Sequence, residues 1–230
     1  MEKMIWRILR EIPDYREFMT VDELNNSTEK LVAKHANVAS IFKIGESRNG
    51  EPIKCLKIGS GEVNALLFAF PHPNEPIGSM TLEYLSWKLA TDEEFREKMN
   101  TTWYIIKCID PFGARLNEGW FKGEWTPKKY ALNYYRPPGY KQVEWSFPIE
   151  YKTLKFNKPV PETKALMKLI DEVKPDFMAS LHNAGFCGAY FYLSDPIPEI
   201  YGKLHEVAER FNIPIHLGEP EVPYQRYLMS

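Results

Sequence analysis

The sequence predicts an α/β fold with a central, mixed and largely parallel sheet between helices. The first observation is the order of the elements: the apolar run of residues 64–70 precedes a helix pattern at residues 77–99, and a second apolar run at residues 101–109 follows it. The second observation is that both runs are nearly continuous in apolar residues, which is typical of parallel strands covered on both faces. Strand, helix and strand in this order therefore indicate a parallel pair.

The residues before this pair predict a helix and a hairpin. Leu24, Leu31 and Ala33 recur at helical spacing. Residues 38–47 and 51–59 each predict a strand, and the turn sequence Ser-Arg-Asn-Gly joins them. We therefore expect a β-hairpin after the first helix.

A long irregular segment interrupts this regular pattern. From Asp110 to about Leu154, glycine, proline and aromatic residues replace any clear periodicity. Such a long segment inside a compact chain is usually functional. No repeat or linker divides the sequence, so we predict a single domain over residues 1–230. After the irregular segment we expect a helix at 161–174, strands at 176–182 and 189–194, and a helix at 199–212.

Composition limits the class of protein and its partners. The chain has 230 residues, of which 44% are hydrophobic and 26% charged, and its formal net charge is −2. A chain of this length and composition can bury a full core. Because no long run of like charge occurs and no stretch has the length of a membrane span, we expect neither a nucleic-acid groove nor a membrane anchor. Small or peptidic partners remain open, and the oligomeric state is not predicted.

The cysteines and the N-terminal residues bear on the cellular compartment. Cys55, Cys108 and Cys187 are far apart and odd in number, a pattern that favours reduced thiols over a disulfide framework. The first residues carry scattered charges and no apolar leader segment. We therefore expect a cytoplasmic location, with an exported form made from a removed leader as the alternative.

Candidate metal ligands stand at the ends of two predicted strands. The sequence Phe-Pro-His-Pro-Asn-Glu-Pro follows the first apolar run and sets His72 and Glu75 three positions apart. A turn needs proline and asparagine, but neither an imidazole nor a carboxylate. His182 ends another predicted strand, and ligands of open α/β sheets bind beyond the carboxyl ends of the strands. Two imidazoles, one carboxylate and an open fourth position make a catalytic zinc set. Taken singly, each residue has a plainer explanation, as a hydrogen-bonded histidine or a carboxylate at a helix N-terminus.

Several segments, in the right order, resemble the zinc carboxypeptidase family. Residues 44–59 are similar to its hairpin, His-Pro-Asn-Glu-Pro-Ile-Gly to its first ligand motif, and residues 110–120 to its Asn-Pro-Asp-Gly segment. Residues 161–183 resemble the helix and strand that lead to its third ligand, so the match runs from about Ile44 to Ser194. The resemblance implies the family's fold and a catalytic Zn²⁺. The ligands that it implies are His72, Glu75 and His182.

The same resemblance implies contacts to the substrate. Arg115 is similar to the family's arginine that stabilises the oxyanion, a task that needs a fixed positive charge. A carboxypeptidase also holds a free α-carboxylate, which the family does with an Asn-Arg pair. Asn133 matches this pair, but Tyr134 stands where the arginine is expected, so we expect Arg136 to replace it. For each arginine the alternative is a structural salt bridge.

The sequence departs from the family near its end. The family's general base is a glutamate well beyond the third ligand, whereas few residues follow His182. We expect the chain to end before the last strands of the sheet, with the base beyond Ser230. The alternative is a shortened relative that has lost or moved its base. No motif singles out a base among Glu118, Glu144, Glu219 and Glu221.

These features predict a zinc-dependent peptidase that removes the C-terminal residue of a peptide through a metal-activated water. One alternative is an N-acyl amino acid deacylase of the aspartoacylase kind, which shares the His-x-x-Glu pair and a distant histidine. The other is a non-catalytic zinc-binding or peptide-binding module. A deacylase takes a short acyl group on one amino acid, the peptidase needs a longer peptide, and a binding module holds zinc and peptide without turnover. The side-chain specificity is not predicted.

Overall fold

A computed structural model describes residues 2–183, 187–191, 193 and 195–216. The chain divides into two compact units, Met1–Asn183 and Ala184–Ser230. The single domain expected over residues 1–230 stays a prediction.

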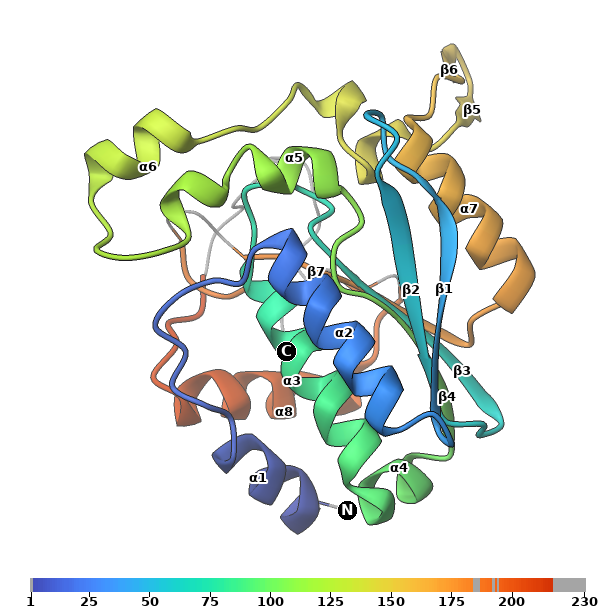
Figure 1. Ribbon diagram of the computed structural model, residues 1–230, viewed down its shortest axis with the longest axis vertical. Coiled ribbons are helices and arrows are strands. Elements are labelled where there is room, and N and C mark those ends of the chain that lie inside the picture. The colour runs from blue at the N-terminus through green and yellow to red at the C-terminus, as the bar shows by residue number, and fades with distance from the viewer. Residues whose placement is uncertain (1, 184–186, 192, 194, 217–230) are drawn as a thin grey trace. The chain divides into compact units, whose positions relative to one another are not determined.

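The first unit is built on a five-stranded mixed sheet with the order β1-β2-β4-β3-β7 (Figure 1). β3 pairs in parallel with β4 and with β7, while β2 is antiparallel to both β1 and β4. The mixed central sheet predicted from the sequence is therefore confirmed, and the predicted hairpin forms its antiparallel part. The strands span Ala39–Glu46 (β1), Pro52–Ile58 (β2), Val63–Ala69 (β3), Thr101–Ile106 (β4) and Phe177–Leu181 (β7).

The side chains of β3 point alternately into two cores, which explains its continuous apolar run. Ala65 and Leu67 are buried in a cluster to which α1 to α4 contribute, whereas Leu66 and Phe68 are buried in a cluster with residues of α7. Figure 1 shows the strands between α2 and α3 on one side and α7 on the other. The prediction of a sheet between helices is confirmed. These helices span Glu2–Arg10 (α1), Val21–Lys34 (α2), Ile77–Thr91 (α3), Glu93–Met99 (α4) and Pro161–Val173 (α7).

Local side-chain chemistry sets the helix ends. α2 begins with a capping box, in which Oγ1 of Thr20 accepts from the N–H of Glu23 and the carboxylate of Glu23 accepts from the N–H of Thr20. This pair satisfies donors that the first turn of a helix leaves free. The helix expected over residues 77–99 is divided at Asp92, which ends α3 and caps α4 by accepting from the N–H of Phe95. Aspartate favours caps over helix interiors because its carboxylate binds nearby backbone donors.

The segment from Asp110 to about Leu154 contains only short elements. Its first half packs on a third core cluster, in which Trp120 and Phe121 are buried with Leu24 and Phe70. Packing on the core, and not periodicity of its own sequence, therefore orders this part of the segment. The elements are α5 (Pro111–Arg115), η1 (Glu118–Trp120), α6 (Pro127–Asn133), η2 (Gly139–Lys141), η3 (Glu144–Ser146) and the hairpin of β5 (Ile149–Tyr151) and β6 (Leu154–Phe156).

The second unit contains α8 (Pro198–Arg210), in agreement with the helix expected at 199–212. Of the strand expected at 189–194, residues 192 and 194 lie outside the described residues, and Ala189 forms an isolated parallel bridge with Ile215. In the part of the chain that the structure describes, no helix is both long enough and apolar enough to cross a membrane.

Candidate metal centre

The loop after β3 turns sharply and holds His72 beside Glu75. Phe70 is fully buried and has a φ of 57°, in the left-handed region that residues other than glycine rarely adopt. This residue directly follows Ala69, the last residue of β3. Nδ1 of His72 lies 3.0 Å from Oε1 of Glu75, and the N–H of Glu75 donates to the carbonyl of His72. Both residues are 5% exposed, so the pair is fixed inside the protein.

β7 brings His182 to the same place. The residue directly follows β7, which runs parallel to β3. Gly78 permits the close approach of α3 to this strand, because a Cβ at that position would lie 2.7 Å from Cβ of Leu181. Nδ1 of His182 donates to Oε2 of Glu75 over 2.7 Å, and the rings of His182 and His72 are 4.7 Å apart between centroids. The structure thus brings together the three residues that the sequence predicted as metal ligands.

A second carboxylate, from Glu144, lies on the other side of His182. Oε2 of Glu144 accepts from Nε2 of His182 over 2.9 Å and lies 3.9 Å from Nε2 of His72. Glu144 belongs to η3, which is fixed to the first turn of α7 by a 2.7 Å contact between the hydroxyls of Ser146 and Thr163. Sequence reasoning named Glu144 only among four possible bases. An irregular segment has no sequence pattern that indicates which of its side chains will point toward the site.

The arrangement offers two overlapping donor sets for a metal ion. On one side, the Nδ1 atoms of both histidines face the carboxylate of Glu75. On the other side, His72, Glu144 and His182 present ligand atoms that all lie within 4.8 Å of one another. Nε2 of His72 is buried and has no hydrogen-bond partner among the described residues. Two imidazoles with one carboxylate suit Zn²⁺, and a ligating histidine usually donates its other ring nitrogen to an oxygen acceptor. The residues therefore fit a zinc ion, with one glutamate as ligand and the other as partner of a histidine.

The charged groups of the centre shift one another's pKa. Burial by itself would raise the pKa of Glu75, but contacts with His182, His72 and Arg136 outweigh burial and hold that pKa well below its usual value. Burial would lower the pKa of His182, yet Glu144 and Glu75 raise it to about 9. Burial also opposes the shift of Glu144, whose pKa is lowered by the hydrogen bond from His182. The contacts with Glu144 and Glu75 thus favour the protonated form of His182, and a metal ion that binds this histidine has to displace a proton.

Arg136 lies against the same loop. Its Nη1 donates to Oε1 of Glu75 over 2.7 Å and to Oδ1 of Asn74 over 3.1 Å. Its Nη2 lies 3.0 Å from Nδ1 of His72. The arginine expected to bind the substrate carboxylate is thus in contact with two of the predicted ligands, while its role toward a substrate stays a prediction.

The other two predicted substrate residues already have partners inside the chain. The guanidinium of Arg115 donates to carboxylates of both Asp22 and Glu51, with a shortest distance of 2.6 Å to each. Asn133 donates from Nδ2 to the carbonyl of Lys129 over 2.8 Å, within α6. An oxyanion or a substrate carboxylate would have to compete with these contacts. Both roles stay predictions.

The remaining base candidates are not at this centre or lie outside the described residues. Glu118 accepts from the N–H of Val21 over 2.7 Å and so serves the start of α2. Glu219 and Glu221 fall in the part of the chain that the structure does not describe. Glu144 is therefore the one base candidate in the described residues that contacts His182.

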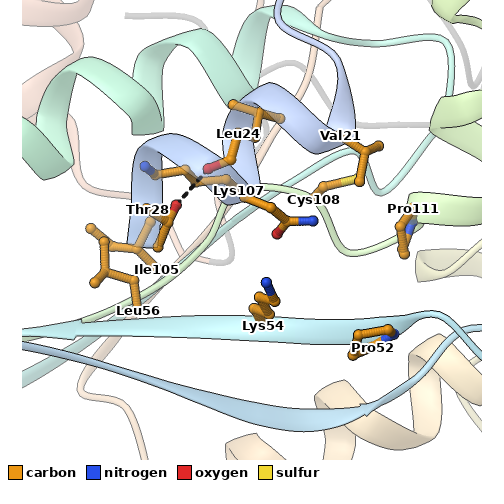
Figure 2. A pocket seen from close by; sticks show the side chains of 11 residues that line it. Val21, Leu24, Thr28, Pro52, Lys54, Leu56, Ile105, Lys107, Cys108 and Pro111 are labelled. Atoms are coloured by element: carbon orange, nitrogen blue, oxygen red, sulfur yellow. Dashed lines mark hydrogen bonds between the residues drawn. The ribbon is translucent and has the colours of Figure 1, made fainter. Parts of the chain in front are cut away.

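A small cavity lies between α2 and the strands β2 and β4 (Figure 2). Its volume is about 20 Å³, which is room for roughly one water molecule. None of the predicted site residues lines it; its walls include Leu24, Lys54 and Cys108. The cavity is therefore too small to hold a peptide.

The solved structures that are similar to this chain include two carboxypeptidases and a thrombin-activatable fibrinolysis inhibitor. Carboxypeptidase A from Helicoverpa armigera matches with a TM-score of 0.58 at 16% identity, over 91% of this chain and 59% of its own. A metallo-carboxypeptidase from Burkholderia cenocepacia matches with a TM-score of 0.52 at 17% identity, over 72% of this chain and 41% of its own. Bovine thrombin-activatable fibrinolysis inhibitor, solved in complex with tick carboxypeptidase inhibitor, matches with a TM-score of 0.51 at 14% identity, over 84% of this chain and 70% of its own. At these identities the likeness shows a shared fold.

The chain covers only part of the carboxypeptidases that it matches, spanning 59% and 41% of the first two. No curated protein matches the sequence. The zinc carboxypeptidase family profile matches residues 24–218, which is most of the chain and includes every described element of the centre. The resemblance inferred from the motifs is confirmed, and the chain belongs to the zinc carboxypeptidase family.

Proposed function

We propose that the protein is a zinc-dependent metallopeptidase that hydrolyses the C-terminal peptide bond of peptides. One observation carries the proposal: the Nδ1 atoms of His72 and His182 converge on the two carboxylate oxygens of Glu75, at 3.0 and 2.7 Å. Membership of the zinc carboxypeptidase family supports it. His72, Glu75 and His182 are the proposed zinc ligands.

The bound zinc ion would act as a Lewis acid and supply a water molecule whose pKa is lowered to about 7. The chain's own residues set the geometry around it. The ligands stand at the ends of two neighbouring parallel strands, β3 and β7, which form a rigid frame. Glu144 accepts from Nε2 of His182 and so holds the ring with Nδ1 toward Glu75.

The proposed substrate is a peptide with a free C-terminus. Arg136, with Asn133, is proposed to bind the terminal carboxylate, because a guanidinium matches a carboxylate with two parallel hydrogen bonds. Arg115 is proposed to stabilise the oxyanion, which requires its release from Asp22 or Glu51. We place this activity in the cytoplasm, an assignment supported by three well-separated cysteines.

Metal analysis tests the ligand assignment. The purified protein should contain close to one zinc per chain by elemental mass spectrometry, and His72→Ala or His182→Ala should each remove it, because a site with two protein ligands holds zinc weakly. His205→Ala is the matched control, since His205 is exposed on α8 and should leave the zinc content unchanged. Stoichiometric zinc in the double variant His72→Ala/His182→Ala would overturn the assignment.

Substrate comparison tests the reaction class. We would follow product formation by mass spectrometry for an N-blocked peptide with a free C-terminus, for its amide, and for an N-acetyl amino acid. Loss of the C-terminal residue from the free peptide supports the peptidase. Turnover of the N-acetyl amino acid alone would identify a deacylase. Binding of zinc and peptide with no product from any of the three would identify a binding module.

A further inference from the structure

The backbone around Arg136 is fixed on both sides. The buried amide of Asn117 accepts from the N–H of Tyr135 over 3.0 Å and donates to the carbonyl of Tyr135 over 2.8 Å. On the other side, Nε2 of Gln142 donates to the carbonyl of Pro137 over 2.6 Å. A change in the contacts of Arg136 therefore has to come from rotation of its long side chain.

The guanidinium of Arg136 occupies atoms that a metal ion needs. Nη2 lies 3.0 Å from Nδ1 of His72, and Nη1 lies 2.7 Å from Oε1 of Glu75. A metal ion bound to these same two atoms would need the space that the guanidinium fills. Arg136 in this position and a metal ion on Nδ1 of His72 therefore exclude each other.

Glu75 needs a positive partner whether or not metal is bound. Its side chain is 7% exposed, and an ionised carboxylate buried without a counter-charge is strongly unfavourable. In this structure Arg136 provides that positive charge. Asn74, which also accepts from Nη1 of Arg136, would retain one contact to the guanidinium after Glu75 is taken by the metal.

We propose that Arg136 and the metal ion are alternative cations on His72 and Glu75, and that Arg136 is free to bind a substrate carboxylate only in the metal-loaded protein. The inference rests on the zinc ligands assigned in the proposed function. It makes recognition of a peptide C-terminus conditional on metal loading. In the metal-free protein, the carboxylate of Glu75 holds the arginine that the substrate requires.

Zinc affinity gives the first test. We would titrate the metal-free wild type, Arg136→Met and Arg136→Lys with zinc against a chromophoric chelator. Removing a charged competitor should make Arg136→Met bind zinc at least about tenfold more tightly than the wild type, with Arg136→Lys in between. Arg16→Met is the control, because Arg16 is exposed and paired with Asp14, and its zinc affinity should not change. Circular dichroism of each metal-free variant confirms that it is folded.

Chemical labelling gives the second test and needs no substitution. Phenylglyoxal reacts with free guanidinium groups, so the labelling of Arg136, measured by peptide mapping, should be slow in the metal-free protein and several-fold faster once zinc is bound. Equal or weaker zinc affinity in Arg136→Met, or labelling that zinc does not accelerate, would overturn the inference while the zinc site stands. Failure of both wild type and Arg136→Met to bind zinc would overturn the inference together with the proposed function.

Discussion

The carboxylate of Glu144 lies 2.9 Å from Nε2 of His182, on the opposite side of the ring from Glu75. A histidine held in this way by two carboxylates has one ring nitrogen for a metal ion and one for a hydrogen bond. The position of Glu144 in η3, anchored on α7, therefore determines how the imidazole of His182 is oriented. If Glu75 is the metal ligand, His182 coordinates through Nδ1, and if Glu144 is the ligand, His182 coordinates through Nε2.

Substitution of Glu75 and Glu144 in turn should show which of them is the metal ligand and which is the hydrogen-bond partner of His182. We expect Glu144→Gln to keep about one zinc per chain with an affinity roughly 10- to 100-fold lower, because the carboxylate that orients His182 is lost. Glu75→Gln should lose the metal. Glu150→Gln, on β5 and paired with Lys155 at the surface, is the matched control and should bind zinc as the wild type does. Chelator competition measures all four proteins, and the reverse pattern would make Glu144 the ligand.

Arg48 should be essential for stability because it joins two fully buried carboxylates. Its Nη2 lies 3.1 Å from Oδ2 of Asp110, and its Nε lies 3.0 Å from Oε1 of Glu162. Arg48→Met would leave both carboxylates without their cation, and removing one partner of a buried pair typically costs about 3–5 kcal/mol. Urea denaturation measures this loss. Arg16→Met, which breaks an exposed pair with Asp14, should leave the free energy of unfolding unchanged; a similar small effect in Arg48→Met would contradict the prediction.

The strands and the main ligand loop were predictable because each depends on local sequence. The apolar run of β3 marks a strand covered on both faces, and His72 and Glu75 follow it at once. The division of the helix at Asp92 was missed because a cap in the middle of a helical pattern resembles an ordinary polar residue. Element type was thus predicted better than element boundaries.

The contacts of Glu144 and Arg136 were not predictable, since both depend on tertiary packing of an irregular segment. Glu144 reaches the centre only because Ser146 of η3 contacts α7, and Arg136 is directed there by the fixed backbone on either side of it. Neither contact produces a periodic pattern or a motif in the sequence. The resemblance to the family named Arg136 as a substitute for a missing arginine, but gave no indication that it would lie on Glu75.

The buried carboxyl group of Asp110 should make the stability of the protein depend on pH. Burial raises its pKa to about 6, although Arg48 and the N–H of Gly113 oppose the shift. The unfolded chain keeps the ordinary value of 3.8, so the folded protein takes up this proton first as the pH falls. The contribution of Asp110 to stability should therefore increase as the pH falls from above 6 toward 4, by at most about 3 kcal/mol.

Asp110→Asn isolates this effect, because asparagine keeps an acceptor for the N–H of Gly113 but does not titrate. The difference in free energy of unfolding between wild type and Asp110→Asn should shift in favour of the wild type between about pH 8 and pH 5. Urea denaturation at several pH values measures it. A difference that stays constant over this range would show that Asp110 does not titrate there.

Arg136 should distinguish substrates with a free C-terminus from their amides. If its guanidinium binds the terminal carboxylate, Arg136→Met should raise KM for a free peptide by roughly 10- to 100-fold, since a charge-assisted pair is lost. KM for the corresponding amide should change little, because the amide offers no carboxylate to pair with. The assays need saturating zinc, so that altered metal loading in the variant does not contribute, and Arg16→Met serves as the charge control. An equal rise in KM for both substrates would mean that Arg136 acts on the loop of Glu75 alone, through the contacts seen in the structure.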